Sequence, residues 1–363
     1  MEFAYNGQLV LINIFLWFIL ILSYRRGYTC CGNKGTRGYG LLFIMMTLFS
    51  TYAFCAADTY HYHEIYNRMQ TVNGPVHVEQ VYFWLLKVLP KDYYLWRLII
   101  WGLASLCLIL TYKRYKLNPQ VAAFTTAVVL LYQFSITRGC LGISVFLLSS
   151  SFFLKPINGK KLISYILGIA GCGLSLYFHR SMFVFICMFL LAYIPINKFS
   201  LFLSLLIFPI LRIYIVPAIE SVTELLSLGD DVMRFTNSYI KGEQLSANIR
   251  GIIQQVINLL PCFISVYILI KANILRSVQG ERYIKMLSRY TFILFYVSML
   301  FYGLNVSAFM SSRILHMMYF PLTIVLSHTY VHNEEYRSLI RKTMIFFFVS
   351  VLYSTLLSMY TWW

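Results

Sequence analysis

Apolar runs of about 16 to 21 residues recur along the whole chain, separated by polar segments. A helix needs a run of this length to cross the hydrocarbon core of a bilayer. A soluble fold could not bury so many such runs in 363 residues, and a membrane β-barrel would alternate polar and apolar residues instead. The sequence therefore predicts an all-α, polytopic membrane protein with one transmembrane domain over residues 1–363.

We expect about twelve transmembrane helices of this kind. They are placed at 9–24, 39–57, 93–112, 119–137, 139–154, 162–178, 182–196, 199–218, 251–271, 287–307, 314–331 and 343–360. The first run is followed by Arg25 and Arg26 and by no small-residue cleavage site, so we expect it to be retained, with the N-terminus outside. Two long loops, 58–92 and 219–250, then lie on the outer side.

The net charge of +17 follows the same arrangement, because Lys and Arg gather in the loops predicted to face the cytoplasm. The positive-inside rule therefore explains the basic composition, and nucleic acid is not required as a partner. No phosphate-binding loop is present, which argues against an ATP-driven pump. His61 and His63 are two residues apart and do not share one face of a helix, so we predict no metal site and no cofactor.

The first outer loop carries the densest polar and aromatic cluster of the sequence. Asp58, Tyr62 and Tyr66 are spaced i, i+4, i+8, so a helix would place all three on one face. A carboxylate and two phenols in a row would suit the hydroxyl groups of a sugar. The alternative is an interfacial helix whose tyrosines lie at the level of the lipid headgroups.

An amphipathic run over 78–86 follows in the same loop and predicts a helix lying in the membrane interface. It contains Glu79, Tyr82 and Trp84. Asp58 and Glu79 are the outer carboxylates nearest the membrane and are candidate general bases. Arg97, one turn into the third span, is placed to pair with either of them.

Three arginines are predicted at tight corners between spans on the outer side, which normally avoids excess positive charge: Arg138, Arg180 and Arg313. A guanidinium group binds phosphate through paired, charge-assisted hydrogen bonds, so three together would suit a pyrophosphate. The alternative is that each arginine extends to lipid headgroups or pairs with an outer carboxylate. Beside Arg180, His179 is either a proton carrier or a structural hydrogen-bonding residue.

These motifs occur in a fixed order: Asp58-xxx-Tyr62-xxx-Tyr66, Glu79 with Tyr82, the Arg138 corner, and Phe178-His179-Arg180-Ser181. In this order and in the spans between them, most of the chain resembles the EpsG-like branch of the Wzy-type polysaccharide polymerases. One position departs from the family pattern. The family usually has Gln after the first corner arginine, whereas this chain has Gly139.

The resemblance implies a metal-independent glycosyltransferase with a GT-C-like fold and no cofactor. Such enzymes join oligosaccharide repeat units carried on undecaprenyl pyrophosphate, at the outer face of the bacterial inner membrane. The product would be O-antigen, capsule or exopolysaccharide. The implied partners are the lipid-linked oligosaccharide, membrane lipids and a chain-length regulator protein.

The resemblance also implies roles for the candidate residues. The three corner arginines, Arg138, Arg180 and Arg313, would hold the pyrophosphate and stabilise the charge that develops as the pyrophosphate leaves. His179, Asp58 or Glu79 would take the proton of the attacking hydroxyl group. The aromatic residues would contact sugars: Tyr62, Tyr66, Tyr82 and Trp84.

Three other functions remain open from the sequence. A flippase or transporter of lipid-linked sugars would place ionisable residues deep in several spans, whereas here they gather at one face. An O-antigen ligase would use the same donor, but the Asp-Tyr-Tyr segment favours a polymerase. A membrane acyltransferase would show an early inward-facing histidine, and the histidines here are mostly predicted to face outward.

Overall fold

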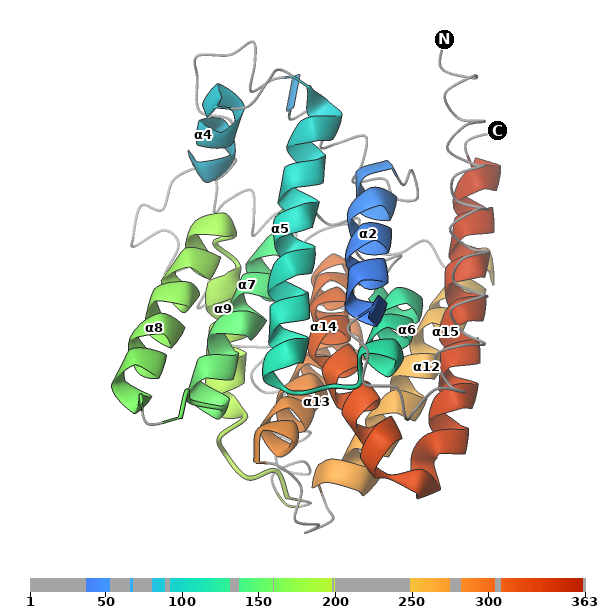
Figure 1. Ribbon diagram of the computed structural model, residues 1–363. Helices are drawn as coiled ribbons and strands as arrows, with labels where there is room; N and C mark the ends of the chain where they lie inside the picture. The colour runs from blue at the N-terminus through green and yellow to red at the C-terminus, as the bar shows by residue number, and fades with distance from the viewer. Residues whose placement is uncertain are drawn as a thin grey trace, which may run out of the picture.

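The structure, a computed structural model, describes residues 37–52, 66–67, 80–88, 92–130, 137–158, 160–197, 199, 249–274, 282–303 and 308–361. Over these residues the chain is helical almost throughout and contains no strand, which confirms the all-α prediction (Figure 1). The predicted spans 9–24 and 199–218 and the loop 219–250 lie outside the described residues. So do Asp58, Tyr62 and Glu79.

Each of the other predicted spans overlaps a helix of the structure. The helices are α2 (Arg37–Tyr52), α4 (Gln80–Val88), α5 (Tyr93–Arg114), α6 (Pro119–Leu130), α7 (Thr137–Leu154), α8 (Lys161–Phe178), α9 (Met182–Leu191), α12 (Ile249–Leu269), α13 (Arg282–Gly303), α14 (Ala308–His332) and α15 (Glu334–Thr361). A short π-helical stretch, Ile270–Ile274, continues α12. The helix predicted over 78–86 corresponds to α4.

Five helical segments within the described residues are long and apolar enough to cross a membrane: Tyr93–Arg114, Lys161–Phe178, Ile257–Ile274, Arg282–Phe301 and Arg313–His332. Shorter apolar segments of α2, α6, α7 and α9 lie beside them (Figure 1). These helices support a multi-pass membrane protein. The total of about twelve spans and the GT-C-like arrangement stay predictions.

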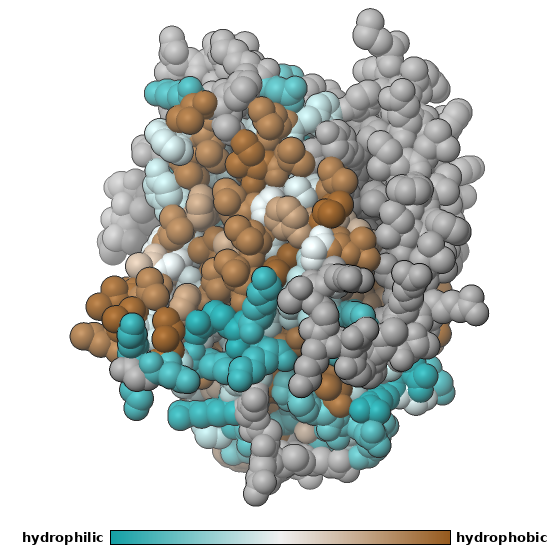
Figure 2. Space-filling model, in the orientation of Figure 1, coloured by the Kyte–Doolittle hydropathy of each residue, from teal (hydrophilic) through white to brown (hydrophobic). Residues whose placement is uncertain are grey.

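Consecutive long helices run in opposite directions, so the bundle has two ends (Figure 1). The upper end is the one at which α5 begins and α8 ends, and α4 lies there. The basic end is the one at which α5 ends and α8 begins. On the side of the molecule that Figure 2 shows, apolar side chains cover the middle and upper part, and polar side chains gather below them. Exposed lysines of the basic end include Lys113, Lys116, Lys160 and Lys161.

A buried hydroxyl network joins three helices in the interior. The Tyr112 hydroxyl of α5 is 2.7 Å from the Thr126 hydroxyl of α6 and 2.8 Å from the Thr323 hydroxyl of α14. All three side chains are fully buried. Because a buried hydroxyl without a partner is costly, this network favours one relative placement of the three helices.

The packing of α7 against α8 depends on small residues. A Cβ atom on Gly168 would lie 2.5 Å from the Phe153 ring, and one on Gly171 would overlap the Ser149 side chain. The missing side chains let the two helices approach closely, as is common between membrane helices. The opposite face of α8 is exposed, with Leu162 at 73% and Ile169 at 66%.

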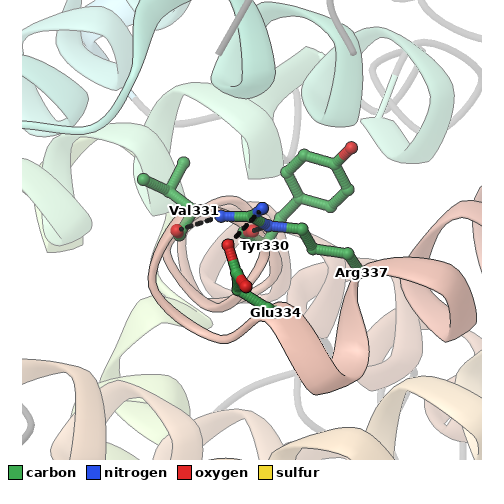
Figure 3. A network of polar contacts seen from close by, with 4 residues as sticks. All are labelled: Tyr330, Val331, Glu334 and Arg337. Carbon is green, nitrogen blue, oxygen red and sulfur yellow. Dashed lines mark hydrogen bonds and ion pairs between the residues drawn. The ribbon is translucent and has the colours of Figure 1, made fainter. Parts of the chain in front are cut away.

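At the basic end, arginines satisfy the last carbonyl groups of helices. Arg337 donates hydrogen bonds to the carbonyls of Tyr330 (2.9 Å) and Val331 (3.0 Å) at the end of α14, and to Glu334 (2.8 Å; Figure 3). Arg114 similarly donates to the carbonyls of Ser151 and Lys155 at the end of α7. Cations at these positions complement the negative end of the helix dipole.

We expect Tyr112→Phe to lower the free energy of unfolding by about 1 to 2 kcal/mol, because two buried threonine hydroxyls lose a partner. Unfolding in mixed detergent micelles would measure this change. Tyr267→Phe is the matched control, since Tyr267 is 53% exposed and its hydroxyl is not part of the network. Equal stability of the two variants would show that the network contributes nothing.

Candidate functional site

The corner between α8 and α9 is a single turn at the upper end of the bundle. His179 follows the last residue of α8 in an extended conformation, and its N–H donates to the Ser175 carbonyl at 3.0 Å. The His179 carbonyl accepts a hydrogen bond from the Met182 N–H at 2.9 Å, so α9 begins at once. His179 is half-buried and Arg180 is exposed. The predicted tight corner at these residues is confirmed.

The N-terminal part of α7 packs against this corner through Gly142. A Cβ atom on Gly142 would lie 3.1 Å from the His179 Cβ and 3.0 Å from the Met182 Cγ. The Ser175 hydroxyl also donates to the Gly142 carbonyl at 2.9 Å. Arg138 lies about one helical turn before Gly142, so the structure brings its turn of α7 close to the His179 corner.

Arg138 was predicted at the corner between two spans, and the structure places it at the start of the second one. It is the second residue of α7, which begins at Thr137, and residues 131–136 before it lie outside the described residues. The first turn of a helix tolerates polar residues because its N–H groups have no partners within the helix. A Thr-Arg pair therefore resembles a loop in the sequence while it is helical in the structure.

Tyr82 connects the first-loop segment to the same corner. Its side chain is fully buried, and its hydroxyl donates to the carbonyl of Phe178, the last residue of α8, at 3.1 Å. Its ring meets the edge of Trp96, in the first turn of α5, with ring centres 5.9 Å apart. This contact places α4 over the end of α8, as Figure 1 shows.

The Trp96 ring belongs to a buried aromatic cluster with Tyr66 and Tyr93. The Tyr66 ring centre is 5.2 Å from that of Tyr93 and 5.8 Å from that of Trp96. Arg97 is also buried, with its guanidinium carbon 5.5 Å from the Tyr93 ring centre. Tyr66 and Tyr82 are therefore both buried against Trp96 in this structure. Their contact with sugars stays a prediction.

Trp84 lies on the other side of α4 and is 59% exposed. Its ring is therefore accessible for contact with a sugar or with the membrane interface. The predicted pairing of Arg97 with Asp58 or Glu79 involves two carboxylates outside the described residues.

Arg313 requires a correction. It was predicted at a corner, but α14 begins at Ala308, so Arg313 lies in the second turn of a helix. The hydroxyls of Ser298 in α13 and Ser311 in α14 each donate to the other residue's carbonyl at 2.8 Å. These bonds satisfy the serines between helices, which explains why a Ser-Ser-Arg segment is helical here.

The three arginines share one feature that the sequence did not show. Arg138 and Arg313 lie in the first two turns of α7 and α14, and Arg180 lies just before α9. A cation at a helix N-terminus is opposed by the helix dipole, in contrast to Arg114 and Arg337 at C-termini. Helix N-termini and guanidinium groups both attract anions, so each position suits an anionic ligand.

One residue without a predicted role lies beside these arginines. His316 is three residues after Arg313, on the same side of α14. The sequence shows only that the two residues are three apart. This spacing places them on one side of a helix only if Arg313 is itself helical, as it is in the structure. Among the described residues, no group of three His, Cys, Asp or Glu side chains could hold a metal ion.

We expect Tyr82→Phe to destabilise the fold by about 1 kcal/mol while most of the activity remains, because Phe keeps the ring but leaves the Phe178 carbonyl without its donor. Thermal unfolding in detergent, beside an assay of polymer length, checks both parts. Tyr165→Phe, at a tyrosine that is 46% exposed, is the control. Normal stability with lost activity would instead show that the hydroxyl contacts substrate.

The comparison with protein families agrees with the resemblance noted in the sequence. The model of the EpsG family matches residues 38–363, which cover most of the chain and every described helix from α4 to α15. No curated protein and no solved structure matches the chain. The chain therefore belongs to the EpsG family and is a multi-pass, polysaccharide-polymerase-like membrane protein.

Proposed function

We propose that this protein polymerises lipid-linked oligosaccharide repeat units on the outer face of the bacterial inner membrane. The growing glycan would pass from undecaprenyl pyrophosphate to the sugar terminus of an incoming lipid-linked unit. Membership of the EpsG family supports a polymerase of this general kind. The surface glycan would be O-antigen, capsule or exopolysaccharide.

The observation that carries the proposal is the position of Arg138 in the first turn of α7 and of Arg180 just before α9, with Arg313 in the second turn of α14. Without an anion, Arg138 and Arg180 add positive charge to the positive end of a helix dipole. A pyrophosphate would remove this conflict, because its oxygens accept hydrogen bonds from guanidinium groups and from free N–H groups. The turn of Arg138 and the corner that holds His179 and Arg180 meet at Gly142.

The reaction exchanges one bond at the anomeric carbon for another. The hydroxyl oxygen of the incoming unit forms the new bond to the anomeric carbon. The bond from that carbon to the carrier's pyrophosphate breaks, and the pyrophosphate leaves with the electron pair. We assign the proton of the attacking hydroxyl to His179, Asp58 or Glu79, and stabilisation of the leaving charge to the arginines, Arg138 first. No metal or cofactor is needed for this step.

The remaining candidate residues would bind the two substrates. Tyr62, Tyr66, Tyr82 and the exposed Trp84 are assigned to the sugars, and Arg97 is assigned to substrate binding as well. The polyprenyl tails would remain in the bilayer, where the exposed apolar face of α8 ends at the His179 corner. A chain-length regulator protein is a further proposed partner.

A flippase of lipid-linked sugars is the second candidate, and the distribution of charge argues against it. A flippase moves its charged substrate through the whole bilayer and needs polar groups at mid-depth. In the described helices, Lys, Arg, Asp and Glu lie within a few turns of a helix end, as Arg97 does in α5 and Arg289 in α13. An O-antigen ligase shares the donor and is separated from a polymerase only by experiment.

Deletion of the gene should collapse the surface glycan from a ladder to a single repeat unit. The ladder requires repeated transfer between lipid-linked units, whereas one capped unit does not. Gel electrophoresis of the surface glycan checks this. Loss of the single unit as well would contradict a polymerase: lipid-linked units accumulating on the outer side would indicate a ligase, and on the inner side a flippase.

Arg138→Lys and Arg313→Lys should each lower polymer formation at least about tenfold, because Lys keeps the charge but not the paired hydrogen bonds to a phosphate. The measurement is polymer length and amount in the deletion strain carrying each variant at equal membrane abundance. Arg282→Lys, at an exposed arginine of the basic end, is the matched control and should keep normal polymer. Near-normal ladders in both variants would rule out the arginine site.

A further inference from the structure

The first part of α13, which begins at the basic end of the bundle, is accessible along one side only (Figure 1). Between Arg282 and Phe295, four residues are not buried: Arg282, Lys285, Arg289 and Ile293. They follow one another at intervals of three or four residues, so they form one stripe along the helix. This stripe, which we call the α13 stripe, begins with three cations and continues upward with an apolar side chain.

Arg289 carries its charge inside a membrane-spanning segment. The segment Arg282–Phe301 is long and apolar enough to cross a bilayer, and Arg289 lies about 10 Å of helical rise beyond its start. Only the Nε atom of Arg289 is enclosed without a partner, so the terminal nitrogens of its guanidinium lie on the accessible side of the helix. A charged group at this depth is costly unless an anion or water solvates it.

The described part of the chain supplies no carboxylate to the α13 stripe. Its carboxylates are those of Asp92, which caps α5 at the upper end, and of Glu334 and Glu335, at the start of α15. None of these three forms an ion pair with Lys285 or Arg289. Because like charges one turn apart on a helix repel each other, an anion beside both side chains would stabilise them.

We propose that Lys285 and Arg289 bind the phosphate of an anionic phospholipid, whose acyl chains lie along the upper part of the α13 stripe. Lysine supplies a point charge, and arginine supplies paired N–H donors that suit a phosphate. Above them, Ile293 is partly exposed, and Phe263 of α12 is 52% exposed with its ring centre 5.0 Å from that of Phe295. Apolar surface therefore continues from the two cations in the direction that acyl chains take.

This inference goes beyond the proposed function and does not depend on it, because the basic end lies opposite the His179 corner. The positive-inside rule predicts that the basic end faces the cytoplasm, and the cytoplasmic leaflet carries anionic lipids. A phospholipid of that leaflet reaches an outward-facing stripe directly and needs no enclosed cavity. Arg282 is left outside the proposed site, since water can solvate it at the exposed start of α13.

Thermal unfolding of the purified protein in a neutral detergent, with added phospholipid, tests the inference. Dioleoyl phosphatidylglycerol should raise the melting temperature more than dioleoyl phosphatidylcholine, which carries the same phosphate without net charge. Arg289→Gln and Lys285→Gln should each weaken the apparent affinity for phosphatidylglycerol about tenfold, as expected when a hydrogen bond between charged groups is lost. Arg341→Gln, at an exposed arginine of the basic end on α15, is the matched control and should bind as the wild type does.

Three results would overturn the inference. Equal stabilisation of the wild type by the two lipids would show that α13 does not select charge. An unchanged preference for phosphatidylglycerol in the Gln variants would place the anionic lipid elsewhere. An equal effect of glycerol 3-phosphate would assign the two cations to a free phosphate. The two lipids are compared within each variant, so a change in basal stability does not affect the result, and either Gln variant decides if the other fails to fold.

Discussion

The interaction of arginine side chains with helix ends organises the two halves of this molecule. At the basic end, Arg114 and Arg337 donate to the last carbonyls of α7 and α14, so charge and helix dipole agree. At the upper end, Arg138 lies in the first turn of α7 and Arg180 lies just before α9, so charge and dipole conflict there. The first arrangement stabilises the fold by itself, whereas the second becomes favourable when an anion is present.

Long-range contacts then decide which residues share the upper end. The bond from Tyr82 to the Phe178 carbonyl joins segments 96 residues apart, and Gly142 admits the His179 corner against α7. Neither contact has a signature in the sequence, because each depends on how three helices pack. The aromatic cluster around Trp96 adds a rigid wall on the α5 side of this corner.

The sequence predicted helices best where an apolar run has clear boundaries. The span predicted over 93–112 is α5, Tyr93–Arg114, because the Asp92 carboxylate caps its start and basic residues end it. The prediction from sequence failed where contacts with another helix keep polar residues helical. Ser311 is an example, because it exchanges hydrogen bonds with Ser298 of α13. Arg313 was therefore predicted to lie in a corner, and His316 was given no role. The tight corner at His179 was predicted correctly because it has only three residues between two apolar runs.

The candidate site lies at the end of α8, a helix whose outer face is exposed. This helix contacts the bundle mainly through the narrow seam of Gly168 and Gly171, and it carries His179 and Arg180 at its upper end. A helix held along one side responds directly to the thickness of the surrounding hydrocarbon, by tilting when the bilayer becomes thinner. The His179 corner is thus attached to a helix that is held along one side only, so we expect acyl-chain length to influence where this corner lies.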